Sequence, residues 1–209
     1  MEFLVKVNSR SDRVAFVFGK ESDVALLDRW KEIVHGKDNP RAQDAKEFAA
    51  LSAKRWRYYS DGKLSVTDLG ELQGAIKSDP DGEYAFILLA NATWQREQPT
   101  LGMCFCRRTW ANHLVVDFLS THPDVIGAVP EKVERVGTGM LLGLAHLAAV
   151  IKARRIWGEA TADSAAFYHR LLGRPVRDVF SIQGSNLERL RLEFQSLRPP
   201  ASMRQTEPD

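Results

Sequence analysis

Short apolar runs, separated by polar and glycine-rich turns, dominate the first 120 residues of the chain. Apolar runs of this length between turn residues predict β-strands. Four of them predict strands, at 13–18, 84–90, 101–107 and 113–120. Apolar residues recur at helical spacing in three further segments, at 21–35, from Pro40 onward and at 67–76. We therefore expect one strand, then helices, then three successive strands.

After residue 136 the pattern changes to helices that alternate with strands. Gly173 follows a helical segment and is a natural helix stop. The expected elements are a helix at 140–153, a strand at 155–161, a helix at 163–172, a strand at 175–182 and an amphipathic helix at 186–197. This order of elements is typical of an α/β or α+β protein.

The composition is that of an ordinary globular protein. The chain has 209 residues, 44% hydrophobic and 27% charged, with a net charge of +2. This length favours one domain, and the balanced charge gives no broad field that would attract a polyanion. The longest apolar stretch, 140–151, is too short to cross a bilayer, and the run at 3–7 is too short for a signal-peptide core. We therefore expect no membrane association.

The two cysteines are Cys104 and Cys106, one residue apart. Such close pairs seldom form a disulfide, so the chain fits a reducing, cytoplasmic compartment. Two cysteines without a second pair nearby do not fit a structural zinc site. We expect no metal.

A short glycine motif, Gly137-Thr138-Gly139, precedes the helix expected at 140–153. The first turn of a helix has backbone N–H groups without internal partners, and glycine lets a phosphate approach them closely. The motif is too short for a P-loop and lacks the third glycine of the dinucleotide fingerprint. On its own, such a motif is more often a plain loop than a phosphate site.

The sequence from 136 to 173 resembles the GNAT superfamily, the Gcn5-related N-acetyltransferases. The resemblance consists of the Gly-x-Gly motif, a long helix, a basic Ala-Arg-Arg turn, a short strand, and a helix with Ala166-Phe167-Tyr168 followed by Leu172-Gly173. It implies an α+β (α/β three-layer) fold with a mixed, mostly antiparallel central sheet flanked by helices. It also implies a single domain at 1–197, with a helical part at about 20–77 and a CoA-binding core at about 83–182. The three prolines and low apolar content of 198–209 predict a flexible tail there.

The resemblance also implies a site, in an opening between the strands at 113–120 and 155–161. Its cofactor-binding residues would be Gly137, Thr138, Gly139 and Met140 at the pyrophosphate of acetyl-CoA, and Leu119, Ser120 and Thr121 beside the pantetheine. Tyr168 would protonate the departing thiolate, because a phenol has a higher ordinary pKa than a thiol. Asp117 and Glu159, each mid-strand, are the candidates for the base. Packing by Tyr168 and salt bridges by both acids are the alternatives.

Several positions depart from the family pattern. Glu134 replaces the usual Arg or Gln three residues before the first glycine, and Thr161, Asp163 and Ser164 occupy the place of the usual Asn. The chain between Ser120 and Gly137 is also longer than the family norm. The expected function is transfer of an acetyl group from acetyl-CoA to a small-molecule or protein amine. The alternative is a catalytically inactive GNAT-like module that binds CoA or a macromolecular partner.

Two basic and aromatic clusters, at 54–59 and 107–110, keep a nucleic-acid partner open without favouring it. For 107–110 the simpler interpretation is a strand end with solvated charges, and on a helix the residues 54–59 would spread over more than one face. A homodimer is also left open.

Overall fold

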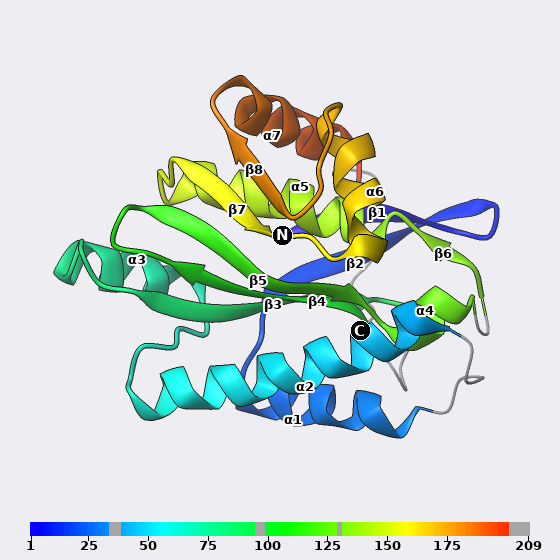
Figure 1. The fold of residues 1–209 in the computed structure, drawn as a ribbon, viewed down its shortest axis with the longest axis horizontal. Coiled ribbons are helices and arrows are strands. Elements are labelled where there is room, and N and C mark those ends of the chain that lie inside the picture. Colours follow the sequence, from blue (N-terminus) through cyan, green and yellow to red (C-terminus); the bar gives the residue numbers. More distant parts are fainter. Residues whose placement is uncertain (34–38, 95–98, 129–130, 201–209) are drawn as a thin grey trace.

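The central feature of the computed structural model is one mixed β-sheet (Figure 1). The structure describes residues 1–33, 39–94, 99–128 and 131–200. In this part of the chain the sheet has eight strands in the order β6-β1-β2-β3-β4-β5-β7-β8. The strands are β1 (Glu2–Val7), β2 (Arg10–Phe18), β3 (Tyr84–Ala92), β4 (Thr100–Arg108), β5 (His113–Thr121), β6 (Val133–Glu134), β7 (Arg155–Glu159) and β8 (Val179–Gln183).

Neighbouring strands are antiparallel, except for the parallel pair β5 and β7. Helices cover both faces, with α1 and α2 on one and α5, α6 and α7 on the other (Figure 1). The helices are α1 (Glu21–Leu27), the 3₁₀ helix η1 (Asp28–Glu32), α2 (Pro40–Asp61), α3 (Leu69–Ser78), α4 (Pro123–Gly127), α5 (Val136–Val150), α6 (Ala162–Leu172) and α7 (Ser185–Leu197). The expected three-layer α+β class, with a mostly antiparallel sheet flanked by helices, is confirmed.

Helix α2 packs closely on the sheet because small residues form its buried stripe. Ala45, Ala49 and Ala53 are almost fully buried, and Ala49 and Ala53 belong to one core cluster with Ile87 and Phe105 of the sheet. Alanine favours the helix and adds little bulk, so the helix axis can approach the strands. Pro40 and the side chain of Asn39, which accepts a hydrogen bond from the Ala42 N–H, fix where the helix begins.

The sheet opens between β5 and β7. The two strands pair only from His113 with Arg155 to Val116 with Gly158. At Gly158 the chains are so close that a Cβ would lie 2.4 Å from the Val116 carbonyl oxygen. The register between β4 and β5 then shifts, which leaves Asp117 as a β-bulge. Beyond it β5 continues to Thr121 without β7 beside it, so the strands diverge.

Several sequence expectations need correction. The strand expected first is the second, because 2–7 forms β1 and pairs with β2 through a tight turn at Asn8, whose φ is 54°. The helix expected at 21–35 breaks after Leu27 into a 3₁₀ helix, and residues 34–35 lie outside the described part of the chain. The strand expected at 175–182 is shorter. Residues 201–209 of the expected tail are also outside the described residues.

The helix expected from Met140 begins four residues earlier, at Val136. Gly137, Thr138 and Gly139 therefore form its first turn and do not precede it. The cause is Arg135, whose left-handed φ of 74° turns the chain directly into the helix. This correction decides which of the expected phosphate-binding residues can face a ligand.

Candidate active site

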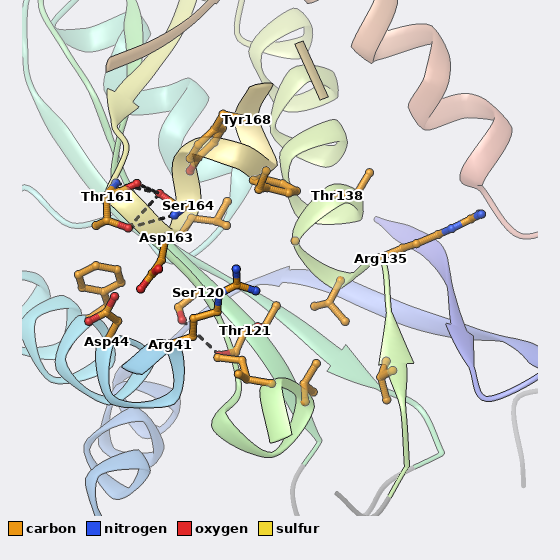
Figure 2. A pocket seen from close by; sticks show the side chains of 18 residues that line it. Arg41, Asp44, Ser120, Thr121, Arg135, Thr138, Thr161, Asp163, Ser164 and Tyr168 are labelled. Atoms are coloured by element: carbon orange, nitrogen blue, oxygen red, sulfur yellow. Dashed lines mark hydrogen bonds between the residues drawn. The ribbon is translucent and has the colours of Figure 1, made fainter. Parts of the chain in front are cut away.

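A cavity of about 300 Å³ lies where β5 leaves β7. Its walls come from α2, the end of β5, α4, the first turn of α5 and the first half of α6 (Figure 2). Leu119, Ser120 and Thr121 line one wall, as the family resemblance implied. Because β5 has no β7 partner at these residues, one backbone edge of the strand borders the opening.

The first turn of α5 presents backbone N–H groups to this cavity. The first hydrogen bond within the helix runs from the Gly139 N–H to the Arg135 carbonyl, at 2.8 Å. Within the described part of the chain, no side chain caps the helix, and the N–H groups of Val136, Gly137 and Thr138 have no acceptor. All three residues line the cavity. Free amides at a helix N-terminus bind anions, since the helix dipole adds partial positive charge there.

Gly137 leaves room for such a ligand. A Cβ at this position would be no closer than 3.8 Å to a neighbouring atom, the Phe167 ring. A Cβ there would therefore be in ordinary van der Waals contact, and a longer side chain would extend toward the cavity that Gly137 lines.

Gly139 and Met140 do not line the cavity. A Cβ on Gly139 would lie 2.3 Å from the Phe3 ring, and Met140 is fully buried, with its Cε 2.8 Å from where a Gly102 Cβ would be. Both residues therefore face the sheet. Of the four residues expected at the pyrophosphate, the structure brings Gly137 and Thr138 to the cavity.

Glu134 points away from the helix N-terminus. Its carboxylate lies 2.5 Å from the Lys132 ammonium and 3.8 Å from that of Lys6, at the outer edge of the sheet. The hydrogen bond from Lys132, together with nearby positive charge, lowers the pKa of the Glu134 carboxyl. The acid that replaces the family's Arg or Gln therefore does not face the cavity, whereas Arg135 does line it.

Tyr168 lines the cavity from α6 and is 4% exposed. Its ring stacks on Phe180, with 3.9 Å between the centroids and 11° between the planes. No residue that the structure describes forms a hydrogen bond with its hydroxyl, which faces the opening (Figure 2). Burial, followed by the nearby Cys104 and Cys106, raises the pKa of the phenol. The hydroxyl is therefore protonated at neutral pH and available to donate a proton.

Asp117 and Glu159 lie elsewhere. The Asp117 carboxylate is 9% exposed and accepts hydrogen bonds from Arg107, at 2.6 and 2.9 Å, and from Arg55, at 2.6 Å. Arg55 belongs to α2, so the acid faces that layer. Glu159 is exposed on β7, opposite Val179 of β8. The structure does not bring either acid to the cavity with Tyr168.

Helix α2 contributes cavity residues that the sequence interpretation missed. Arg41, Asp44 and Phe48 all line the cavity, and Arg41 extends into the opening beside Ser120 and Thr121 (Figure 2). Their spacing of three and four residues places them on one helix face. That spacing was visible in the sequence, but nothing there indicated that this face meets the end of β5.

The first turn of α6 supplies the remaining polar residues. Thr161 and Ser164 form a reciprocal cap, in which the Thr161 side chain accepts from the Ser164 N–H and the Ser164 side chain accepts from the Thr161 N–H. Between them Asp163 extends into the opening, and its carboxylate faces that of Asp44 across the cavity (Figure 2). Burial, and then the charge of Asp163, raise the pKa of the Asp44 carboxyl.

No protein-family model matches the sequence. The curated proteins give no match either. Solved structures do. Three of the structures that resemble this chain are described as acetyltransferases of the GNAT family.

One, from Desulfovibrio desulfuricans, is 14% identical, with 81% of this chain and 98% of that chain aligned at a TM-score of 0.44. Another, from Staphylococcus aureus Mu50, is 8% identical, with 80% and 97% aligned at 0.44. A third, from Chromobacterium violaceum, is 13% identical, with 87% and 95% aligned at 0.40. Their descriptions give the same family that residues 136–173 resemble. At this level of similarity, what the chain does must be argued from its own residues.

The described residues also limit two other classes of site. Among them, no three His, Cys, Asp or Glu side chains gather as metal ligands would. In the same ranges, no helix has both the length and the apolar composition needed to span a membrane.

Proposed function

We propose that the protein is an acetyl-CoA-dependent N-acetyltransferase. The observation that supports this most directly is that two chemically different groups open onto one cavity. These are the free N–H groups at the start of α5 and the buried, unpartnered hydroxyl of Tyr168. The first suits the diphosphate of coenzyme A, and the second suits its thiolate.

The residues present fit this co-substrate. Gly137 and Thr138 would hold the pyrophosphate through their backbone amides, as helix N-termini hold other phosphates. Arg41 adds positive charge at the wall of the same cavity, whereas the Arg135 side chain extends away from the opening (Figure 2). Leu119 lies where β5 has no β7 partner, and its backbone would form hydrogen bonds with the pantetheine arm. Acetyl-CoA supplies the activated thioester.

Transfer forms a C–N bond and breaks the C–S bond. The acceptor ammonium first loses a proton to solvent. The free amine then attacks the thioester carbonyl, and a backbone N–H of β5 near Leu119 stabilises the oxyanion. Tyr168 then donates its proton to the departing thiolate sulfur. Its raised pKa suits this step, because the phenol stays neutral until the thiolate forms.

Calorimetric titration with acetyl-CoA tests the proposal. We expect binding by the wild-type protein, and Gly137→Glu should weaken it by about 100-fold or more, because a carboxylate would stand in front of the amides. Gly74→Glu is the matched control, since Gly74 is on α3 with open space around it. No heat from a folded sample, or unchanged affinity in Gly137→Glu, would overturn the proposal.

A CoA-binding module without catalysis is the second candidate. It is favoured by the position of Asp117 and Glu159, which leaves neither expected base in the cavity. Tight CoA binding with no thiol release on any amine of a broad panel would select this alternative.

A further inference from the structure

Two carboxylates that face each other across the cavity identify the class of acceptor. We infer that the acceptor is a di- or polyamine, one cationic group of which lies between Asp44 and Asp163 while another amino group reaches Tyr168. This inference rests on the proposed acetyl transfer and deepens it. It states that the acceptor carries a second positive charge, a property that the fold does not indicate.

The two acids come from opposite walls, Asp44 from α2 and Asp163 from the first turn of α6. Figure 2 shows their carboxylates directed toward one another at the opening. Neither accepts a hydrogen bond or forms an ion pair with any residue in the described part of the chain. Arg41 lies one turn from Asp44 on the same helix, yet its guanidinium extends toward Ser120 and Thr121 instead (Figure 2).

Like charges that face each other in a partly enclosed site repel, and this repulsion is relieved by a cation between them. The raised pKa of Asp44, caused by burial and by Asp163, agrees with this arrangement. Lysine and arginine pair readily with exposed acids, but no such pairing occurs here. The two acids therefore suit a ligand that brings its own ammonium group as their partner.

Tyr168 marks the other end of the acceptor independently of the acids. Its side chain is 4% exposed, and its hydroxyl faces the same cavity with no partner among the described residues. Asp163 and Tyr168 are five positions apart on α6, which corresponds to about 7.5 Å along the helix axis. A diamine with a short aliphatic spacer could therefore place one nitrogen near the acids and the other near the phenol.

The cavity would then bind its two substrates by opposite charges. The anionic part of coenzyme A would be held at the start of α5 and near Arg41, and the cationic acceptor at Asp44 and Asp163. In the reaction the reacting ammonium loses one proton to water, and its nitrogen forms the C–N bond as the C–S bond breaks. The thiolate takes a proton from Tyr168, and the proton that the nitrogen loses as the amide forms returns the phenol to its neutral state. The second ammonium group stays charged and remains between the carboxylates.

Acceptor preference gives the first test. Release of free thiol from acetyl-CoA is followed with cadaverine, pentylamine and δ-aminovalerate, which share a five-carbon chain but differ in charge at the far end. We expect kcat/KM to fall in that order, with cadaverine above pentylamine by about tenfold or more. Asp44→Asn and Asp163→Asn should each move this ratio toward one. Asp61→Asn, which removes a charge from the far end of α2 and outside the cavity wall, should leave the ratio as it is.

Binding without turnover gives the second test. NMR titration of the wild-type protein with cadaverine alone should shift signals of Asp44 and Asp163, and Asp44→Asn should weaken this binding. If thiol is released with equal kcat/KM for cadaverine and pentylamine, the inference is overturned while the acetyltransferase proposal stands. If cadaverine binds at the two acids but no amine is acetylated, the cation site stands and the enzyme proposal fails. Absence of cadaverine binding at these acids overturns the inference.

Discussion

Phe3 packs so tightly against Gly139 that a Cβ on the glycine would lie 2.3 Å from its ring. Phe3 is on β1 and fully buried, and Gly139 is in the first turn of α5. The contact brings the start of the helix onto the sheet beside the cavity. Gly139 therefore serves packing, and Gly137, two residues earlier, faces the ligand side.

This difference predicts opposite effects for two similar substitutions. Gly139→Ala should lower the free energy of unfolding by about 1–3 kcal/mol, because the added methyl group overpacks the Phe3 contact. Gly137→Ala should raise it slightly or leave it unchanged, since alanine favours the helix and has room there. Urea denaturation of both variants measures this. Equal stability of the two would contradict the assigned roles.

Much of the fold could be predicted from the sequence because its apolar patterns are local. The runs at 84–90, 101–107 and 113–120 correspond to β3, β4 and β5, and Gly173 ends α6 with a left-handed φ of 64°. Strand β1 was missed because 2–7 was considered only as a candidate signal segment. β1 pairs with β2 and with β6, which follows it by more than 120 residues, and the local sequence pattern does not reveal such a distant pairing.

The site was less accessible to sequence reasoning. Leu119, Ser120, Thr121, Gly137, Thr138 and Tyr168 line the cavity, and all six were named from the family resemblance. Asp44 was not named, because its place opposite Asp163 depends on how α2 crosses the end of β5. Asp117 was considered as a base because it is an acid in an apolar strand. The bulge and its two arginines provide the partners that such an acid requires.

Tyr168→Phe should slow acetyl transfer while sparing coenzyme A binding. Removing a general acid lowers turnover by about 10²–10⁴-fold, and the phenylalanine ring can keep the stacking on Phe180. Stopped-flow measurement of thiol release, together with calorimetric titration of coenzyme A, separates the two effects. Full turnover in the variant would remove Tyr168 from the mechanism.

Tyr168 should also make stability depend on pH in the alkaline range. Burial raises the pKa of its phenol above the value of about 10 expected in the unfolded chain. Above that pH the unfolded chain loses the proton more readily than the folded protein, so stability is fully present below about pH 10 and falls as pH rises. Tyr168→Phe should make this fall shallower. A part of the fall should remain, because the pKa values of Tyr59 and Tyr84 are also raised. Parallel pH profiles from denaturation experiments would contradict the prediction.

Asp117→Asn should affect stability more than ligand binding. The substitution removes the charge that pairs with Arg107 and Arg55, at a site where the carboxylate is 9% exposed. We expect a loss of about 2 kcal/mol in the free energy of unfolding. Asp28→Asn is the control, because Asp28 pairs with Arg57 near the surface and should contribute less than about 1 kcal/mol. Lost acetyl-CoA binding in folded Asp117→Asn protein would show that the acid acts on the cavity.

Arg135 combines a strained backbone with a place on the cavity wall, and one substitution tests both. Its φ of 74° lies in the left-handed region, which disfavours residues with a Cβ by about 1–2 kcal/mol. Arg135→Gly should therefore increase the free energy of unfolding by up to about 1 kcal/mol, after allowance for the greater freedom of glycine in the unfolded chain. Gly173→Ala, at a φ of 64° with open space around it, should change stability in the opposite direction.

The same Arg135→Gly protein should bind acetyl-CoA more weakly, with a smaller dependence on salt, because one positive charge beside the α5 amides is gone. Higher stability with weaker binding would mean that the strain is retained for function, whereas unchanged affinity would assign the arginine to the start of the helix alone.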